Sequence, residues 1–327
     1  MVNRARRCHN RIEMTPFQRN ELAVRLAKMA QNGVFIGTSS WKYEGWLGQV
    51  YTPERYTHHG QFSKPVFNRT CLQEYAEIFK TVCVDSAYYR FPEPSDLQLL
   101  ASQVPDDFLF AIKVTDQITI RRFPNLARLG PRAGQMNPDF LNPDLFASKF
   151  IASCETIKPK VGLLIFEFSA FHRSEFERGR DFVAALDTFL RRIPTGWRYG
   201  VEIRNSTFLE PLYFEVLRKH DVTHVFNSWE RMPPLPEQLR RPGAFTNDKM
   251  VAARLLLEPG HPYALAVKEF SPYDRIVRPC PSARAGAVEI IQNATAARPK
   301  RAFIYVNNRL EGNAPQTIWA ILEQAGA

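Results

Sequence analysis

The sequence predicts an α/β protein: a single TIM-like (β/α)8 barrel with an N-terminal helical extension. Eight short apolar, β-branched or aromatic runs alternate with segments of helical period, which is typical of a parallel sheet, and a count of eight favours closure into a barrel. No linker divides the 327 residues into two halves. An open doubly wound sheet is the alternative. It usually carries a G-x-G-x-x-G turn after its first strand, whereas residues 37–41 read Gly-Thr-Ser-Ser-Trp.

The predicted elements follow one another along the chain. Residues 1–33 form a basic tail and a helix, and residues 34–327 form the barrel domain. Strands are predicted at residues 34–38, 82–86, 108–114, 161–168, 198–204, 222–227, 250–257 and 302–307. Helices are predicted at residues 72–79, 95–102, 143–157, 174–192, 211–220, 283–297 and 317–324, and four of them have a proline near the start, where its fixed φ is favourable. Residues 232–242 contain four prolines and are expected to be a loop.

Basic residues exceed acidic ones by 43 to 33, and the net charge of +10 favours anionic partners such as phosphorylated metabolites or nucleic acid. Half of this excess lies in residues 1–32, where seven Lys or Arg stand against two Glu. Five scattered cysteines without a C-x-x-C pair indicate a reducing compartment and no zinc site. The longest apolar run is far shorter than the ~20 residues of a membrane helix. We therefore expect a cytoplasmic protein without a membrane partner, and leave its oligomeric state open.

Charged residues gather at the predicted carboxyl ends of the strands, where the active site of such a barrel lies. Glu202 and Arg204 stand two apart on one strand, so both side chains point to the same face. We predict that both are catalytic: Glu202 as general acid or base, because only a carboxylate exchanges a proton at working pH, and Arg204 as the group that positions the substrate. The structural alternative is a buried ion pair that orders the barrel mouth.

Other strand ends supply candidate substrate-binding residues. Lys113 and Arg254 together with Arg204 would form a cationic mouth suited to phosphate or carboxylate, and the alternative is that they are surface charges at the rim. Asn307 and Asn308 offer amides for hydroxyl or phosphate contacts, or else they form a turn at the end of the last strand.

Aromatic and acidic residues complete the predicted site. Trp41 and Tyr88 are expected to stack on a sugar or a base, with a place in the core as the alternative. Asp85 and Glu167 are predicted to line the pocket. Together with Glu202 they would offer a site for a divalent metal, Mg²⁺ or Mn²⁺, although no cofactor is predicted. The arginine pairs at 121–122 and 240–241 are expected to be solvated loop charges, with contact to an anion as the alternative.

Five motifs follow one another from about residue 34 to the C-terminus. They are Ile36-Gly37-Thr38-Ser39-Ser40-Trp41 with Tyr43, Trp46, Gly48 and Tyr51; Tyr88-Tyr89-Arg90-Phe91-Pro92; Phe108-Leu109-Phe110-Ala111-Ile112-Lys113; Val201-Glu202-Ile203-Arg204-Asn205; and Asn307-Asn308 with Gly312, Ala314 and Pro315. In these motifs the sequence resembles the YecE-like family, domain of unknown function 72. The resemblance implies a TIM-like barrel with a polar pocket at its top and no established activity. The chain departs from the family pattern at Cys83, Asp85 and Glu167.

The strand-end charges favour an enzyme, an isomerase or a hydrolase, that acts on a small anionic, hydroxyl-rich substrate such as a sugar phosphate. A nucleic-acid-binding or nuclease-like barrel is one alternative, with nucleic acid as the partner of the basic tail and the aromatic residues. A barrel that only binds its ligand, without catalysis, is the other. Salt dependence distinguishes the first two, because binding to a polyanionic strand weakens steeply as salt is added.

Overall fold

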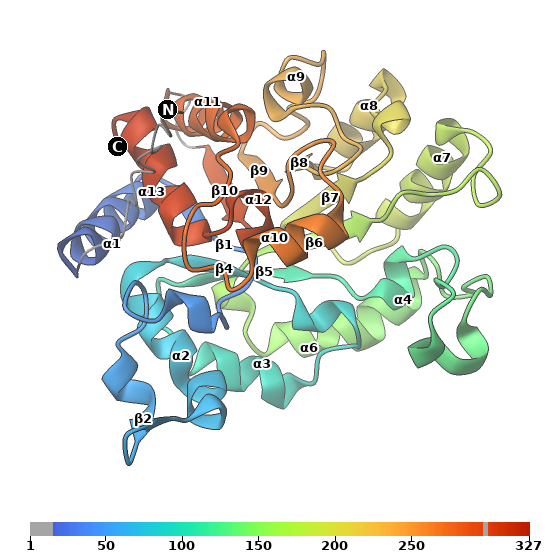
Figure 1. Ribbon diagram of the computed structural model, residues 1–327. Helices are drawn as coiled ribbons and strands as arrows, with labels where there is room; N and C mark the ends of the chain where they lie inside the picture. The colour runs from blue at the N-terminus through green and yellow to red at the C-terminus, as the bar shows by residue number, and fades with distance from the viewer. Residues whose placement is uncertain (1–15, 297–299) are drawn as a thin grey trace, which may run out of the picture.

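The structure is a computed structural model that describes residues 16–296 and 300–327. Eight parallel strands form a closed barrel in the order β1-β10-β9-β8-β7-β6-β5-β4, with helices around it (Figure 1). The ring closes where Thr38 pairs with Val82. The predicted barrel is therefore confirmed. Its strands are β1 (Val34–Thr38), β4 (Thr81–Val84), β5 (Leu109–Lys113), β6 (Val161–Phe168), β7 (Tyr199–Ile203), β8 (Thr223–Ser228), β9 (Met250–Leu255) and β10 (Arg301–Val306).

Most helices connect consecutive strands, as the alternating pattern predicts. Two short strands, β2 (Thr57–His58) and β3 (Gln61–Phe62), pair separately from the barrel. The helices are α1 (Pro16–Gln31), α2 (Lys64–Ile78), α3 (Pro94–Ala101), α4 (Asp116–Thr119), α5 (Pro143–Leu145), α6 (Ala152–Glu155), α7 (Gly179–Leu190), α8 (Pro211–Lys219), α9 (Leu235–Leu239), α10 (Tyr263–Phe270), α11 (Pro281–Ala296), α12 (Asn308–Glu311) and α13 (Ala314–Ala325).

The N-terminal helix precedes the barrel and packs against its outside, as predicted. α1 contacts β1 and α2, and Arg25 lies over the ring of Trp319 in α13, with 4.8 Å between its Cζ and the ring centre. The basic tail predicted before this helix falls on residues 1–15, which lie outside the described residues.

The expected loop at residues 232–242 is wrong in part, because it contains α9. Pro234 is the helix N-cap and Pro236 lies in the first turn, where a missing backbone N–H costs no hydrogen bond. The buried amide of Gln238 fastens this helix to the barrel, since its Nε2 donates to the carbonyl oxygens of Asn227 at 2.7 Å and Pro233 at 2.6 Å. Long-range contacts of this kind leave no periodic signal in the sequence.

The barrel interior changes from apolar to charged along the strands. Phe35, Ala111, Ile165, Ala252 and Phe303 belong to one buried cluster. Side chains alternate between the two faces of a strand, so the inward positions two residues further along β5, β6 and β9 are those that carry charge. The apolar layer supports the charged one, which therefore lies at the carboxyl ends of the strands.

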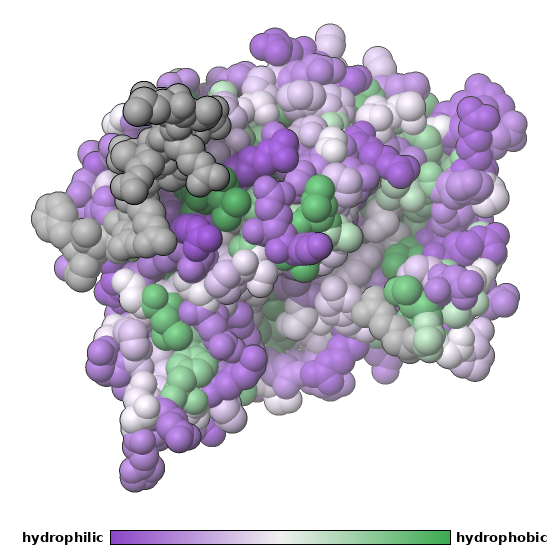
Figure 2. All heavy atoms as spheres, in the orientation of Figure 1, coloured by the Kyte–Doolittle hydropathy of each residue, from purple (hydrophilic) through white to green (hydrophobic). Residues whose placement is uncertain are grey.

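Hydrophilic residues cover most of the face shown in Figure 2, and its apolar residues form small separate groups. Within the described residues, no helix is both long enough and apolar enough to cross a membrane.

Candidate functional site: a buried charge network at the barrel mouth

Six charged side chains from five strands or strand ends form one network at the carboxyl end of the barrel. Three are cations and three are carboxylates, so their formal charges cancel. They are Asp85 after β4, Lys113 at the end of β5, Glu167 in β6, Glu202 and Arg204 in and after β7, and Arg254 in β9.

Glu167 is the centre of this network. Its Oε2 lies 2.9 Å from Lys113 Nζ, 2.9 Å from Arg204 Nη2 and 2.7 Å from Arg254 Nη1. Burial alone would raise the pKa of this carboxyl, but the charges of the three cations hold the pKa well below its usual range. Glu167 is therefore ionised at neutral pH.

Glu202 is fully buried and both of its oxygens are engaged. Arg254 Nη1 lies 2.6 Å from Oε2, and Arg204 Nε donates to Oε1 at 3.1 Å. Glu202 is also paired in register with Glu167 on the neighbouring strand, where two carboxylates would repel each other without the arginines between them. Burial alone would lower the pKa of Arg254. The negative charge of Glu202 and the other acidic groups around it instead raise this pKa well above its ordinary value.

Asp85 is the carboxylate of the network that reaches solvent. Its side chain is 35% exposed, against 3% for Glu167 and 0% for Glu202, and its Oδ1 lies 3.4 Å from Arg254 Nη2. The thiol of Cys83, two residues earlier in the chain, lies near Asp85, with 3.9 Å between its sulfur and Asp85 Oδ1. Burial raises the pKa of that thiol to about 12, so it is neutral.

Two aromatic rings cover the cations of the network. Lys113 Nζ lies 3.7 Å from the ring centre of Tyr88, and Arg204 Cζ lies 3.7 Å from that of Trp229. Such contacts stabilise a desolvated cation by about 2 kcal/mol. The sequence pattern predicted a role for Tyr88 but not for Trp229, which follows β8 outside the motifs of the resemblance.

Residues 35–327 match the model of a family described as "Protein of unknown function DUF72". The chain belongs to the DUF72 family. Two curated relatives, each named UPF0759 protein YecE and from Escherichia coli strains K12 and O157:H7, are 28% identical over 151 residues, which is 45% of this chain. The match spans 47%, about half, of the length of each relative.

Solved structures of DUF72 proteins share the fold. The chain aligns with a DUF72 family protein of Enterococcus faecalis V583 at a TM-score of 0.59 and 16% identity, covering 90% of this chain and 96% of the other. A DUF72 family protein of Thermotoga maritima MSB8 also gives a TM-score of 0.59, at 19% identity, covering 90% and 99%. At these identities the likeness concerns the fold alone.

Several of the DUF72 motif residues make contacts within the protein. The side-chain oxygen of Asn307 caps α12, and that of Asn308 accepts from Trp46 Nε1 at 3.2 Å and from the backbone N–H of Ala314 at 2.7 Å. Trp41 is 6% exposed, and its carbonyl oxygen accepts from the hydroxyl of Tyr51. These contacts join the ends of β1 and β10, and they leave the predicted substrate contacts of Trp41, Asn307 and Asn308 as predictions.

The buried carboxylates of the network, Glu167 and Glu202, do not fit a divalent metal. Lys and Arg nitrogens lie against the oxygens that a hard cation would need. Among residues 16–296 and 300–327, no group of three or more His, Cys, Asp or Glu could hold a metal ion.

A cavity of approximately 270 Å³ adjoins the network at the ends of β4, β5 and β6, lined among others by Tyr88, Asp116, Arg121 and Ser169. The arginine was expected to be a solvated loop charge, but the ring centres of Phe140 and Phe176 both lie 5.4 Å from its Cζ. Its Nε is buried without a hydrogen-bond partner, and it forms no ion pair within the described chain. The lining also includes Arg122 and the carboxylates Asp116 and Glu175, so its two arginines and two acidic residues have a formal charge of zero.

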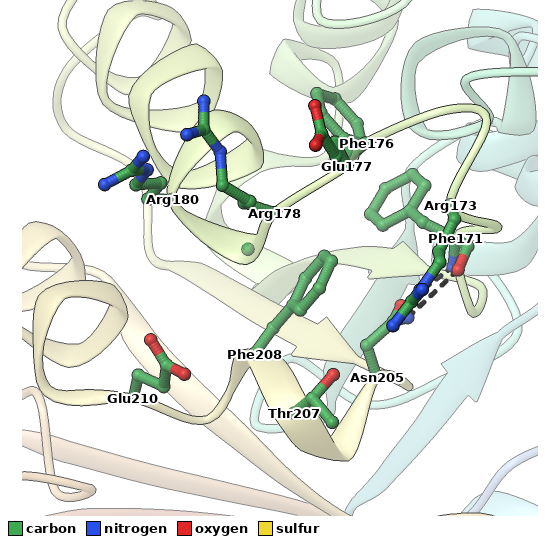
Figure 3. Close-up of a pocket in the computed structure, with 11 residues that line it drawn as sticks. Phe171, Arg173, Phe176, Glu177, Arg178, Arg180, Asn205, Thr207, Phe208 and Glu210 are labelled. Carbon is green, nitrogen blue, oxygen red and sulfur yellow. Dashed lines mark hydrogen bonds between the residues drawn. The ribbon is translucent and has the colours of Figure 1, made fainter.

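A larger cavity of approximately 550 Å³ lies further out, beside the ends of β6 and β7. In Figure 3 the ring of Phe208 points toward Phe171 and Phe176, whereas Arg178 and Arg180 extend away from it at the start of α7. This cavity has an aromatic floor and a solvated charged rim.

Proposed function

We propose that the protein is an enzyme that acts on a small, anionic, hydroxyl-rich substrate at the carboxyl ends of the barrel strands. The buried network of six charged side chains carries this proposal. Burying ions costs several kcal/mol each, and apolar side chains of similar volume often stabilise a core equally well or better. A barrel that needed only stability would not require these groups at its mouth.

The anionic part of the substrate binds in the cavity beside the network. Because three carboxylates neutralise Lys113, Arg204 and Arg254, the sequence-predicted cationic mouth attracts an anion less than its lysine and arginines alone would. Arg121 Nε is buried without a hydrogen-bond partner, and the side chain lines the cavity next to Tyr88, together with Arg122, Asp116 and Glu175. A phosphate or carboxylate group held there leaves the hydroxyl-bearing part of the substrate against the network.

Proton transfer has two candidate carboxylates. Glu202, the sequence-based choice, has both oxygens paired and no exposed surface. Asp85 is partly exposed, with its Oδ1 3.4 Å from Arg254 Nη2, so a substrate can reach its carboxylate. We therefore assign substrate contact to Asp85 and keep the role of Glu202 as a prediction that the same experiment tests.

The experiment screens phosphorylated sugars and sugar acids for turnover, and then compares three variants on the active compound. Asp85→Asn is expected to lower kcat by roughly 10²–10⁴, the size of a lost acid–base step. Arg121→Gln is expected to raise KM with little change in kcat, since it removes a binding charge remote from the reaction.

Arg240→Gln, at an exposed position after α9, is the matched control for loss of one arginine. If Asp85→Asn retains full turnover while Glu202→Gln loses it, the assignment to Asp85 fails and the sequence-based one stands. If no compound turns over or binds, the enzyme proposal fails.

A further inference from the structure

A second basic cavity lies at the opposite end of the barrel, where the strands begin. Its volume is approximately 450 Å³, and its lining includes Trp197, Arg198, Lys249 and Arg301. Arg198 directly precedes β7, Lys249 directly precedes β9, and Arg301 is the first residue of β10. The barrel topology brings these residues together, although they are far apart in the sequence.

The cations of this cavity are not neutralised. Lys113, Arg204 and Arg254 at the mouth each contact a carboxylate, whereas Arg198, Lys249 and Arg301 form no ion pair among the described residues. One acidic residue, Asp221, lines the cavity with them. The formal charge of the lining is therefore +2, from three cations and one carboxylate.

Arg198 is held in a fixed orientation. Its Nε donates to the carbonyl oxygen of Gly162 at 2.7 Å, and its Nη2 donates to that of Val161 at 2.6 Å. These bonds anchor the guanidinium at the start of β6 and leave its Nη1 as a donor. Although the residue is exposed overall, partial burial of the guanidinium, and then the charge of Arg301, lower the pKa of Arg198. An anion in the cavity that both arginines line would offset this repulsion.

We infer that this cavity binds the phosphate group of a small phosphorylated molecule. Two guanidinium groups and an ammonium group are the usual donors to phosphate, and a preoriented guanidinium loses little freedom on binding. The volume exceeds what inorganic phosphate fills and falls within the range of small-ligand sites. Trp197 lines the same cavity and offers a flat apolar surface to the rest of the molecule. Because it lies at the opposite end from the network, this site is independent of the proposed reaction.

Isothermal titration at low ionic strength, with inorganic phosphate and with a nucleoside monophosphate, tests the inference. Arg301→Gln is expected to weaken phosphate binding about fivefold or more, as is Arg198→Lys, which keeps the charge but loses the hydrogen bonds that fix the side chain and its Nη1 donor. Arg240→Gln, which removes one exposed arginine elsewhere, is expected to leave the affinity unchanged. Thermal unfolding of each variant shows that it is folded, and Arg301→Gln decides the matter if Arg198→Lys does not fold.

A tighter affinity for the nucleoside monophosphate than for phosphate would assign the Trp197 side of the cavity to a planar group, and equal affinities would limit recognition to the phosphate. The inference is overturned if phosphate does not bind at millimolar concentration, or if it binds the Arg301→Gln protein as well as the wild type. It is also overturned if phosphate does not bind while an oligonucleotide binds and weakens in these variants, because the face then recognises a polyanion.

Arg121→Gln separates this site from the mouth. This substitution is expected to leave phosphate binding at the cavity of Arg198 and Arg301 intact. A loss of phosphate binding in Arg121→Gln alone would therefore concern only the proposed enzyme site.

Discussion

Replacing Glu167 by Gln tests whether the charge network holds the barrel mouth together. The substitution preserves the shape of the side chain but removes the negative charge that three cations approach within 2.9 Å. The variant leaves Lys113, Arg204 and Arg254 with two carboxylates instead of three. Breaking a buried ion pair by removing one partner typically costs about 3–5 kcal/mol, because a buried charge is left uncompensated.

A protein of this size loses about 2 °C in Tm per kcal/mol, so we expect Glu167→Gln to unfold about 6–10 °C below the wild type. Glu155→Gln is the control, because it removes a carboxylate from an exposed pair with Lys158 at 2.8 Å, where the loss is about 0–1 kcal/mol. Differential scanning calorimetry at pH 7 measures both. If Glu167→Gln melts within about 1 °C of the wild type, the network does not stabilise the fold as argued.

The same variant has a predictable dependence on pH. The pKa of Glu167 is lower in the folded than in the unfolded protein, so its stabilisation is present above the unfolded pKa of ~4.3 and is lost as pH falls toward the folded value. The difference in Tm between wild type and Glu167→Gln should therefore shrink as the pH is lowered below about 5. A difference that stayed constant to pH 3 would contradict the assigned direction of the pKa.

Three further outcomes are expected. Burial lowers the pKa of His224 to about 3, so the folded protein keeps this ring neutral. The free energy of unfolding should therefore fall by up to about 1.4 kcal/mol per pH unit below about pH 6.5. Urea unfolding at several pH values measures this fall, which should be smaller in His224→Gln. Arg204→Lys loses the fork that joins Glu202 and Glu167, and should destabilise by about 1–3 kcal/mol in urea unfolding, whereas no loss would mean that a point charge suffices. Asn308→Ala leaves two buried donors unpaired and should lower Tm by a few degrees; an unchanged Tm would show that neither hydrogen bond matters.

The sequence predicts the strands closely where buried strands are uniformly apolar. The predicted bounds at residues 34–38 and 161–168 match β1 and β6, because both runs are mostly apolar and are followed by polar residues; Glu167 is the one charged residue in β6. The helix predicted at 72–79 begins earlier, at Lys64, since the first turns of α2 are largely exposed and add little to the hydrophobic period. The short helices α10 and α12 were not predicted at all, because helices this short carry hardly more than two turns of pattern.

The candidate site was predictable to the extent that the fold determines it. Period-two alternation and barrel closure bring Lys113, Glu202 and Arg254 to one end, so their proximity follows from strand positions alone. Which of these side chains form ion pairs does not follow, because that depends on how far each side chain reaches across the barrel. Glu167, for example, was predicted as a possible metal ligand, whereas it contacts three cationic side chains. The two rings beside Arg121 belong to Phe140 and Phe176, which are 19 and 55 positions away in the sequence. Local sequence patterns do not predict such contacts.

The position of the excess charge follows from the same argument. A net charge of +10 suggests a basic active site, yet the mouth network contains as many carboxylates as cations and adds nothing to that excess. Burial explains the balance, because an unpaired ion costs too much in the interior, whereas Arg301 and Lys249 at the base of the barrel are exposed and can stay unpaired in water. Composition therefore indicates that anionic partners are expected, but only burial and pairing decide which end of the barrel is available to them. By that criterion the cavity at the start of the strands is the place to look, since its lining has three cations and one carboxylate.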